Sequence, residues 1–218
     1  MTAPTRDAMA GLMLKLALDI GGVFYRGWPD ADFWPRWTAR TGLVANALED
    51  FLSHAPEARD ARLGRITAAE YYARAGERLA ADPGMLKALA EEAYPSDFNE
   101  TLAAQVRAWR AAGVAVSACT NSLSSEAEVK ARPALAGLFD HVITSRDVGA
   151  GKPDPAIFRA LVERLQAEPA GILFVDDALA HVEAARAAGL RAVHFRSTAQ
   201  AIADLSAFYP DTRASSRR

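Results

Sequence analysis

Four short stretches of the sequence contain residue types that could transfer a phosphoryl group, and each follows an apolar run. The first is Asp19-Ile20-Gly21-Gly22, in which one carboxylate is followed by two glycines. A carboxylate held beside glycine can attack phosphorus in line, because the missing side chains let a tetrahedral anion approach the backbone N–H groups. We therefore predict that Asp19 is a nucleophile and that Gly21 and Gly22 contact the bound anion.

The second and third stretches supply groups that complement this carboxylate. They are Thr120-Asn121 and Gly151-Lys152-Pro153. The hydroxyl of Thr120 and the amide that follows it can bind phosphoryl oxygens. The ammonium group of Lys152 is a compact positive charge that offsets repulsion between a carboxylate and a phosphate dianion.

The fourth stretch is the pair Asp176-Asp177. Together with Asp19, the pair offers hard oxygen ligands of the kind that Mg²⁺ takes in proteins, so we predict Mg²⁺ as a cofactor. The same two acids could also cap the helix that follows them, since acidic side chains favour a helix N-terminus. The two roles are compatible.

Short buried strands are needed to hold these stretches in place. Apolar runs predict strands over residues 12–18, 114–120, 141–144, 172–175 and 192–195. Helical patterns lie between them, such as the one that begins at Asp154-Pro155 with an N-cap acid and a proline in the first turn. Strands that alternate with helices predict an α/β, Rossmann-like parallel sheet with helices on both faces. Because ligands bind at the carboxyl ends of such strands, the four polar stretches should meet there.

One long segment breaks this alternation of strands and helices. Residues 25–95 contain helical patterns and turn signals but no convincing strand. We predict that this segment is a helical cap inserted after the first strand, and that residues 1–24 and 96–218 form the α/β core. We interpret residues 1–11 as a loose leader.

The bulk composition excludes several classes of protein. The 218 residues are 50% hydrophobic, enough for a sizeable core, and the net charge of −2 provides no field that would gather nucleic acid or an anionic membrane. No apolar window approaches the ~18 residues of a membrane span. The single cysteine, Cys119, lies in a buried run and indicates a core residue in a reducing, cytoplasmic setting. We expect a small phosphorylated metabolite as the partner, and the sequence leaves the oligomeric state open.

The order and spacing of four motifs, ALDIGGV, SACTNS, GKPDP and FVDDALAHVEAARAAGL, resemble the haloacid dehalogenase-like (HAD) hydrolase superfamily. The resemblance covers roughly residues 12–24 and 96–200, and it implies a Rossmann-like core with a helical cap between the two parts. It also implies that Asp19 forms an aspartyl-phosphate and that Lys152 is the stabilising base.

The same resemblance implies roles for the remaining polar residues. Thr120 and Asn121 would hold the phosphate. Asp177 would be the preferred direct ligand of the metal, with Asp176 beside it acting directly or through water. The backbone carbonyl of Gly21 would be a further ligand.

The sequence departs from most phosphatases of this superfamily at Gly21, where they carry an aspartate that protonates the leaving oxygen and later activates water. General acid–base catalysis typically contributes a factor of ~10² to 10⁴, so its loss need not abolish hydrolysis. A good leaving group or another proton donor could compensate. A subgroup with glycine at this position looks similar and includes sugar-phosphate phosphatases. We therefore expect a Mg²⁺-dependent phosphatase that acts on a small phosphomonoester, such as a sugar phosphate or a nucleotide-like metabolite.

Two other functions remain open at this point. One is a 2-haloacid dehalogenase, whose halide leaving group needs no proton but which has no use for a metal site. The other is a phospho-ligand-binding protein that has lost its general acid and is catalytically weak or inactive. Arg26, just past the nucleophile turn, is an expected substrate contact. His181 either orients a neighbour at the metal site or lies on a helix surface.

Overall fold

The structure is a computed structural model that describes residues 14–25, 31–93 and 97–209. A five-stranded parallel sheet forms its centre, with the strand order β3-β2-β1-β4-β5. The strands are β1 (Lys15–Leu18), β2 (Val116–Thr120), β3 (Val142–Thr144), β4 (Ile172–Asp176) and β5 (Arg191–His194). All five predicted strands are therefore confirmed, with ends that differ by up to a few residues. Residues 12 and 13 of the first predicted strand lie outside the described residues.

The register of the sheet brings three strand ends together. Leu18 at the end of β1 pairs with Ala118 of β2 on one side and with Val175 of β4 on the other. Asp19 therefore leaves the sheet between the ends of β2 and β4. The central position of β1 explains why the residues that follow these three strands can share one site.

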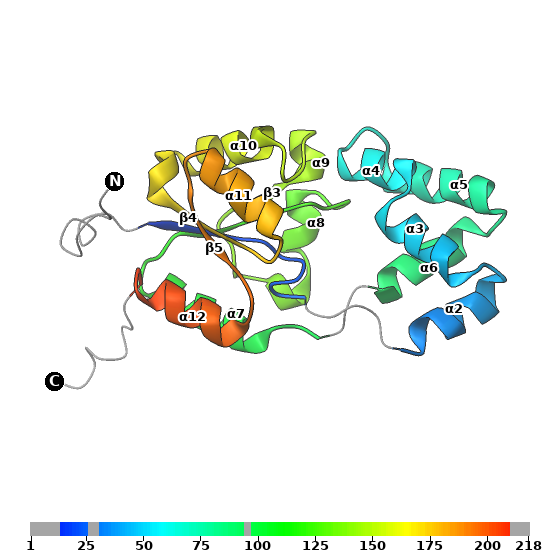
Figure 1. The fold of residues 1–218 in the computed structure, drawn as a ribbon, viewed down its shortest axis with the longest axis horizontal. Coiled ribbons are helices and arrows are strands. Elements are labelled where there is room, and N and C mark those ends of the chain that lie inside the picture. The colour runs from blue at the N-terminus through cyan, green and yellow to red at the C-terminus, as the bar shows by residue number, and fades with distance from the viewer. Residues whose placement is uncertain (1–13, 26–30, 94–96, 210–218) are drawn as a thin grey trace.

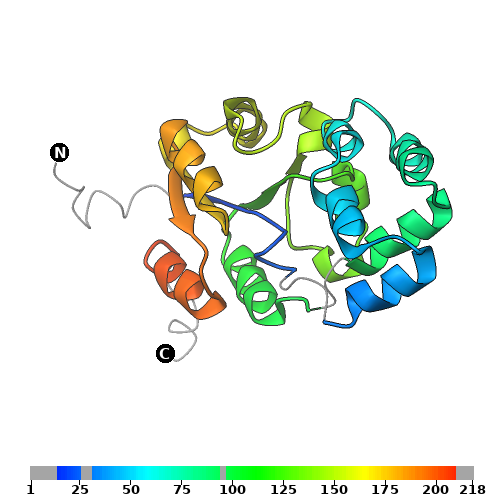
Figure 2. The same cartoon turned by 45° about the vertical axis from the view of Figure 1, so that its right-hand side comes forward.

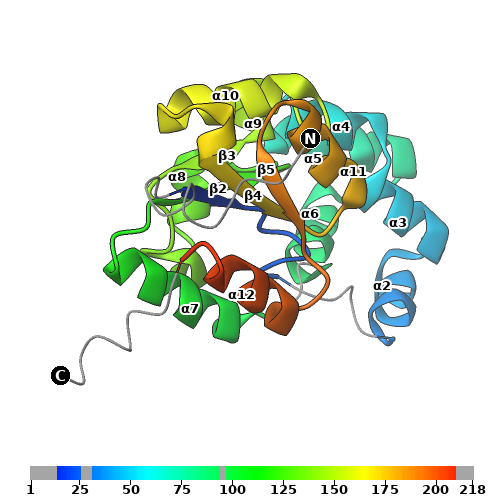
Figure 3. The same ribbon diagram turned by 60° about the vertical axis from the view of Figure 1, so that its left-hand side comes forward.

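Helices cover both faces of this sheet, as predicted (Figures 1 and 3). Leu16 and Leu18 pack on one face with α7 (Glu100–Ala111) and α12 (Thr198–Ser206). Ala17, between them, packs on the other face with α10 (Pro155–Leu165) and α11 (Leu179–Ala187). This alternation is what a strand buried on both sides requires. The helices of this part of the chain are α7 (Glu100–Ala111), α8 (Glu126–Lys130), α9 (Ser145–Val148), α10 (Pro155–Leu165), α11 (Leu179–Ala187) and α12 (Thr198–Ser206), with 3₁₀ turns η1 (Pro133–Leu135) and η2 (Pro169–Gly171).

The helix starts follow local capping chemistry. The side chain of Asp154 accepts a hydrogen bond from the N–H of Ala156, and Pro155 is the first residue of α10, as predicted. Helix α11 begins at Leu179, and just before it Asp176 Oδ1 accepts a hydrogen bond from the N–H of Ala178.

A second group of helices lies beside the sheet layer and shares its own apolar cluster. These are α2 (Phe33–Thr41), α3 (Ala45–Ser53), α4 (Pro56–Arg62), α5 (Ala68–Leu79) and α6 (Pro83–Ala93), which we call the helical segment. Figures 1 and 2 show them, in blue to green, as a separate body at one end of the sheet. Trp37 and Tyr71 are fully buried in its cluster. The predicted boundaries of the insertion fall at or beside residues 26–30 and 94–96, which lie outside the described residues.

The helical segment contacts the α/β part through the end of α4. The hydroxyl of Ser145, on α9, donates a hydrogen bond to the carbonyl oxygen of Arg62 at 2.6 Å. Gly64 adopts φ +68°, and a Cβ atom there would lie 2.5 Å from the carbonyl oxygen of Arg146, so the close approach requires glycine. None of the described helices is both long and apolar enough to cross a membrane.

Candidate active site

Three of the predicted site residues stand at adjacent strand ends. Asp19 directly follows β1, Thr120 ends β2, and Asp176 ends β4. Lys152 comes from the loop before α10, and Asp177 follows Asp176. Arg26 lies outside the described residues, so its predicted substrate contact stays a prediction.

Lys152 links the two buried carboxylates of the site. Its Nζ atom lies 2.8 Å from Asp19 Oδ1 and 2.6 Å from Asp176 Oδ2. The side chains of Lys152 and Asp176 are 0% exposed, and that of Asp19 is 10% exposed. One cation thus neutralises part of the charge of two acids away from solvent, where an unpaired charge would be costly.

The carboxylate of Asp176 is held on both oxygens. Oδ2 accepts the hydrogen bond from Lys152, and Oδ1 accepts one from the N–H of Ala178 at 2.9 Å. Nδ1 of His181 also lies 3.0 Å from Oδ1 and donates to it when that nitrogen carries the proton. Of the two readings left open for His181, this contact supports the one in which the imidazole orients a neighbour at the site.

The pKa values of the site follow from burial and from the Lys152 ammonium. Burial raises the pKa of Asp19, and the charge of Asp176 raises it further, against the opposing effect of Lys152. Burial alone would raise the pKa of Asp176, but the hydrogen bond with His181 and the charge of Lys152 hold it below its usual range. Burial would lower the pKa of Lys152, but the two carboxylates outweigh it and raise that pKa. Lys152 therefore stays protonated and acts as a fixed charge.

Asn121 positions the backbone of Lys152. Its Nδ2 donates to the carbonyl oxygen of Lys152 at 2.9 Å, and its Oδ1 accepts from the N–H of Lys152 at 2.8 Å. A Cβ atom at Gly151 would lie 2.9 Å from Asn121 Oδ1, so glycine makes room for this pair of bonds. The side-chain amide is thus engaged by protein, and the phosphate contact predicted for Asn121 remains a prediction.

The donor set at the strand ends fits a divalent cation. Carboxylate oxygens of Asp19, Asp176 and Asp177 all lie within 4.8 Å of one another. Gly22 adopts φ +71°, and a Cβ atom there would collide with the carboxylate of Asp177. The backbone therefore leaves a space that the Asp177 carboxylate fills. Burial, and then the charge of Asp176, raise the pKa of Asp177, so a nearby cation would relieve repulsion between the two acids.

A cavity of about 370 Å³ lies between the strand ends and the helical segment. Thr120 and Asn121 line it from the sheet side, together with Gly21 and Gly22. No atom lies within 4 Å of a Cβ placed on Gly21, so the space beside this residue is open. The lining from the helical segment comprises Leu52, Ser53, Ala58, Arg62, Tyr71, Ala90 and Ala93.

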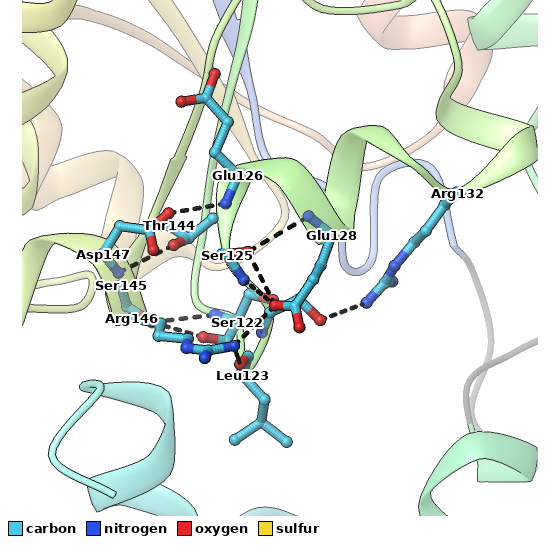
Figure 4. Close-up of polar contacts among 11 residues, drawn as sticks. Ser122, Leu123, Ser125, Glu126, Glu128, Arg132, Thr144, Ser145, Arg146 and Asp147 are labelled. Atoms are coloured by element: carbon cyan, nitrogen blue, oxygen red, sulfur yellow. Dashed lines mark hydrogen bonds and ion pairs between the residues drawn. The ribbon is translucent and has the colours of Figure 1, made fainter. Parts of the chain in front are cut away.

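The loop after Asn121 is fixed against α9 (Figure 4). The N–H of Ser122 donates to Ser145 Oγ at 3.0 Å, and the guanidinium of Arg146 donates to the carbonyl oxygen of Leu123 at 3.0 Å. Ser145 therefore touches both the loop that carries Thr120-Asn121 and the carbonyl oxygen of Arg62. Arg62 and Ser145 could not be predicted from the sequence, because neither lies in a motif and only the tertiary contact joins them.

The chain is similar in sequence to known proteins. A family model described as haloacid dehalogenase-like hydrolase matches residues 16–189. Among curated proteins, the chain is 30% identical over 152 residues to a phosphoglycolate phosphatase of Cereibacter sphaeroides, covering 69% of this chain and 65% of that protein. It is 40% identical over 85 residues to phosphatase MT3486 of Mycobacterium tuberculosis, covering 38% of this chain and 39% of that protein. These matches each span less than two thirds of the relative.

Solved structures share the fold. A HAD family enzyme of Bacteroides thetaiotaomicron, in complex with magnesium and inorganic phosphate, has a TM-score of 0.71 at 16% identity, with 85% of this chain and 96% of that chain covered. A dehalogenase with an intermediate complex has a TM-score of 0.60 at 20% identity, with 85% of this chain and 86% of that chain covered. At these identities the similarity shows a shared fold and does not distinguish a phosphatase from a dehalogenase.

Proposed function

Because the chain belongs to the haloacid dehalogenase-like hydrolase family, we propose that it is a Mg²⁺-dependent phosphatase that hydrolyses a small phosphomonoester through an aspartyl-phosphate. The observation that carries the proposal is the contact of Lys152 with both Asp19 and Asp176, beside the third carboxylate of Asp177. A 2-haloacid dehalogenase, whose halide leaving group needs no proton, has no use for a metal site built from three clustered acids. The substrate phosphate and a divalent cation would then bind together at this edge of the sheet.

In this mechanism Asp19 attacks the phosphorus atom. The N–H of Ile20 and the ammonium of Lys152 both donate to Asp19 Oδ1, which leaves Oδ2 as the attacking oxygen. The bond from phosphorus to the substrate oxygen then breaks, and the alcohol departs with a proton from solvent or from the substrate. Water next attacks the phosphorus of the aspartyl-phosphate, which releases inorganic phosphate and restores Asp19.

The fixed groups of the site stabilise the negative charge that builds up during both steps. Lys152 is protonated and prepositioned, so it needs no reorganisation as the phosphoryl group moves. Asn121 holds the backbone of Lys152, and Thr120 offers its hydroxyl at the same strand edge. Asp19, Asp177 and the carbonyl of Gly21 would hold Mg²⁺, with Asp176 acting directly or through water. When bound, the cation would neutralise phosphate charge.

In this proposal the chain belongs to the subgroup of phosphatases in which glycine stands in place of the second aspartate. The open space beside Gly21 is the place from which that aspartate would protonate the leaving group. The enzyme would then favour substrates with a good leaving group. The helical segment, over residues 25–95, would serve as the cap that closes the cavity and excludes water.

A panel of phosphate esters tests this function. We expect release of inorganic phosphate with Mg²⁺, loss of release with EDTA, recovery when Mg²⁺ is added back, and none at any point from Asp19→Asn. Release of halide from 2-haloacids that persists in EDTA would favour the dehalogenase instead. Phosphate binding by wild-type protein without turnover of any ester would favour the non-catalytic binding protein.

A further inference from the structure

Arg62 brings a positive charge into the wall of the cavity. It is the last residue of α4, is half-buried, and lines the same cavity as Gly21 and Thr120. The catalytic scheme above does not use it. A guanidinium across the cavity from the strand ends is suited to a part of the substrate that does not react.

The side chain and backbone of Arg62 are both held in place. Its Nε donates to the carbonyl oxygen of Ala58 at 3.2 Å, and its Nη2 donates to that of Ser53 at 2.8 Å. Its own carbonyl oxygen accepts from Ser145, which also accepts from the N–H of Ser122 in the loop after the phosphate motif. The remaining amino group, Nη1, is left for a ligand. Because these contacts fix the guanidinium beforehand, the Arg62 side chain would lose little additional conformational entropy when a ligand binds.

The acids closest to Arg62 in sequence are paired with other arginines. Glu57 lies 2.6 Å from Arg78, and Asp60 lies 3.0 Å from Arg65. Among the ion pairs of the described residues, none involves Arg62.

The second arginine of the cavity wall differs in this respect. Arg132 points toward Glu128, whose pKa it helps to lower (Figure 4). Arg62 is therefore the cavity arginine that, within the part of the chain described, faces the ligand space without a carboxylate partner. A half-buried cation in this position favours an anion from the ligand.

Apart from Arg62, Ser53 and Tyr71, the wall on the side of the helical segment is apolar, with Leu52, Ala58, Ala90 and Ala93. The hydroxyl of Tyr71 is already bonded to the carbonyl oxygen of Phe51 at 2.8 Å. A volume of about 370 Å³ lies near the lower end of the ~300 to 1,000 Å³ usual for ligand pockets. A small, compact ligand with a second charge fits such a wall better than a sugar or a nucleoside.

We propose that Arg62 binds a second anionic group of the substrate, so that the site selects small phosphomonoesters that also carry a carboxylate or a second phosphate. This inference rests on the proposed phosphatase function and names its substrate class. The reacting phosphate lies at the strand ends, and the second anion meets Nη1 of Arg62 across the cavity.

Matched pairs of esters test the selection. 2-Phosphoglycolate is compared with 2-hydroxyethyl phosphate, which replaces the carboxylate by a hydroxymethyl group. 1,3-Propanediol bisphosphate is compared with 3-hydroxypropyl phosphate for the second phosphate. We expect a higher kcat/KM for the member that carries the second anionic group in at least one pair. The pair that shows this preference identifies a carboxylate or a phosphate as the group that Arg62 binds.

Variants of Arg62 link that preference to the residue. Since hydrogen bonds to charged groups contribute ~1.5–3 kcal/mol, Arg62→Met should lower kcat/KM for the charged ester by about 10- to 150-fold and change the neutral ester by less than about threefold. Arg62→Lys should recover part of the loss. Arg59→Met, at an exposed position of the same helix, should leave the preference unchanged.

A binding measurement separates recognition from catalysis. In the Asp19→Asn background, calorimetry should show tighter binding of the preferred charged ester than of its neutral partner, and adding Arg62→Met should remove that difference. Equal losses for both members of a pair would make Arg62 a purely structural residue and overturn the inference. A wild-type preference for the neutral esters would overturn it as well, with the phosphatase function intact. Absence of both turnover and binding for all four esters would overturn the proposed function itself.

Discussion

The Nζ atom of Lys152 lies 2.6 Å from Oδ2 of Asp176, and neither side chain is exposed to solvent. The same ammonium contacts Asp19 at 2.8 Å. Removing one partner of a buried ion pair is strongly destabilising, because it leaves an uncompensated buried charge. The site therefore depends on Lys152 for its stability as well as for its proposed chemistry.

We predict that Lys152→Met lowers the free energy of unfolding by about 3–5 kcal/mol, measured by urea denaturation, and abolishes phosphate release. The double variant Lys152→Met/Asp176→Leu should be more stable than Lys152→Met alone, since it no longer buries the second carboxylate without a partner. An unfolding free energy for Lys152→Met equal to that of the wild type would contradict this view of the cluster.

Two adjacent glycines should respond differently to the same change. Gly22→Ala should strongly weaken Mg²⁺ binding, because φ +71° disfavours alanine and its Cβ would displace the Asp177 carboxylate. Gly21→Ala should bind Mg²⁺ nearly as the wild type does, since no atom lies within 4 Å of the added Cβ and the backbone carbonyl is kept. Titration calorimetry with Mg²⁺ measures both. Equal Mg²⁺ affinity in the two variants would argue against Asp177 as a ligand.

The open space beside Gly21 allows the missing acid to be restored. General acid catalysis is typically worth a factor of ~10² to 10⁴, and it matters most when the leaving group is a poor one. We expect Gly21→Asp to raise kcat for alkyl phosphates more than for p-nitrophenyl phosphate, with Gly21→Asn as the control of equal size. A gain that is uniform across leaving groups would count against the view that the wild-type enzyme relies on a good leaving group.

Much of this site could be predicted because it depends on residues next to strands. The apolar runs before Asp19, Thr120 and Asp176 predict strand ends, and parallel pairing brings those ends to one edge. The strongest local signals, such as the cap at Asp154-Pro155, were also confirmed.

The contacts that could not be predicted join segments far apart in the sequence. The hydrogen bond from Ser145 to Arg62 joins residues 83 positions apart, and no periodicity or motif records it. The two hydrogen bonds between the Asn121 side chain and the backbone of Lys152 likewise join residues 31 positions apart. The hydrogen bond from the N–H of Ala178 to Oδ1 of Asp176, just before α11, is likewise not visible in the apolar pattern.

Cys119 precedes Thr120 and provides a further test of the site. Burial raises the pKa of its thiol from 9.0 to about 12, so at pH 8 the folded protein holds the protonated, unreactive form. We predict that iodoacetamide at pH 8 neither labels Cys119 nor inhibits the native enzyme, and that labelling becomes rapid in guanidinium chloride, where the pKa returns toward its usual value. Mass spectrometry of the alkylated protein measures this. Fast labelling of the native form with loss of activity would mean that the thiol is exposed near the substrate.

The most direct test of the central claim is to trap the phosphorylated enzyme. Protein mixed with Mg²⁺ and an ester that it hydrolyses is quenched in acid within one turnover, digested and analysed by mass spectrometry. The account predicts a mass increase of one phosphoryl group on the peptide that contains Asp19, and no such increase in Asp19→Asn. Turnover without a phosphorylated Asp19 peptide, or continued turnover by Asp19→Asn, would contradict it.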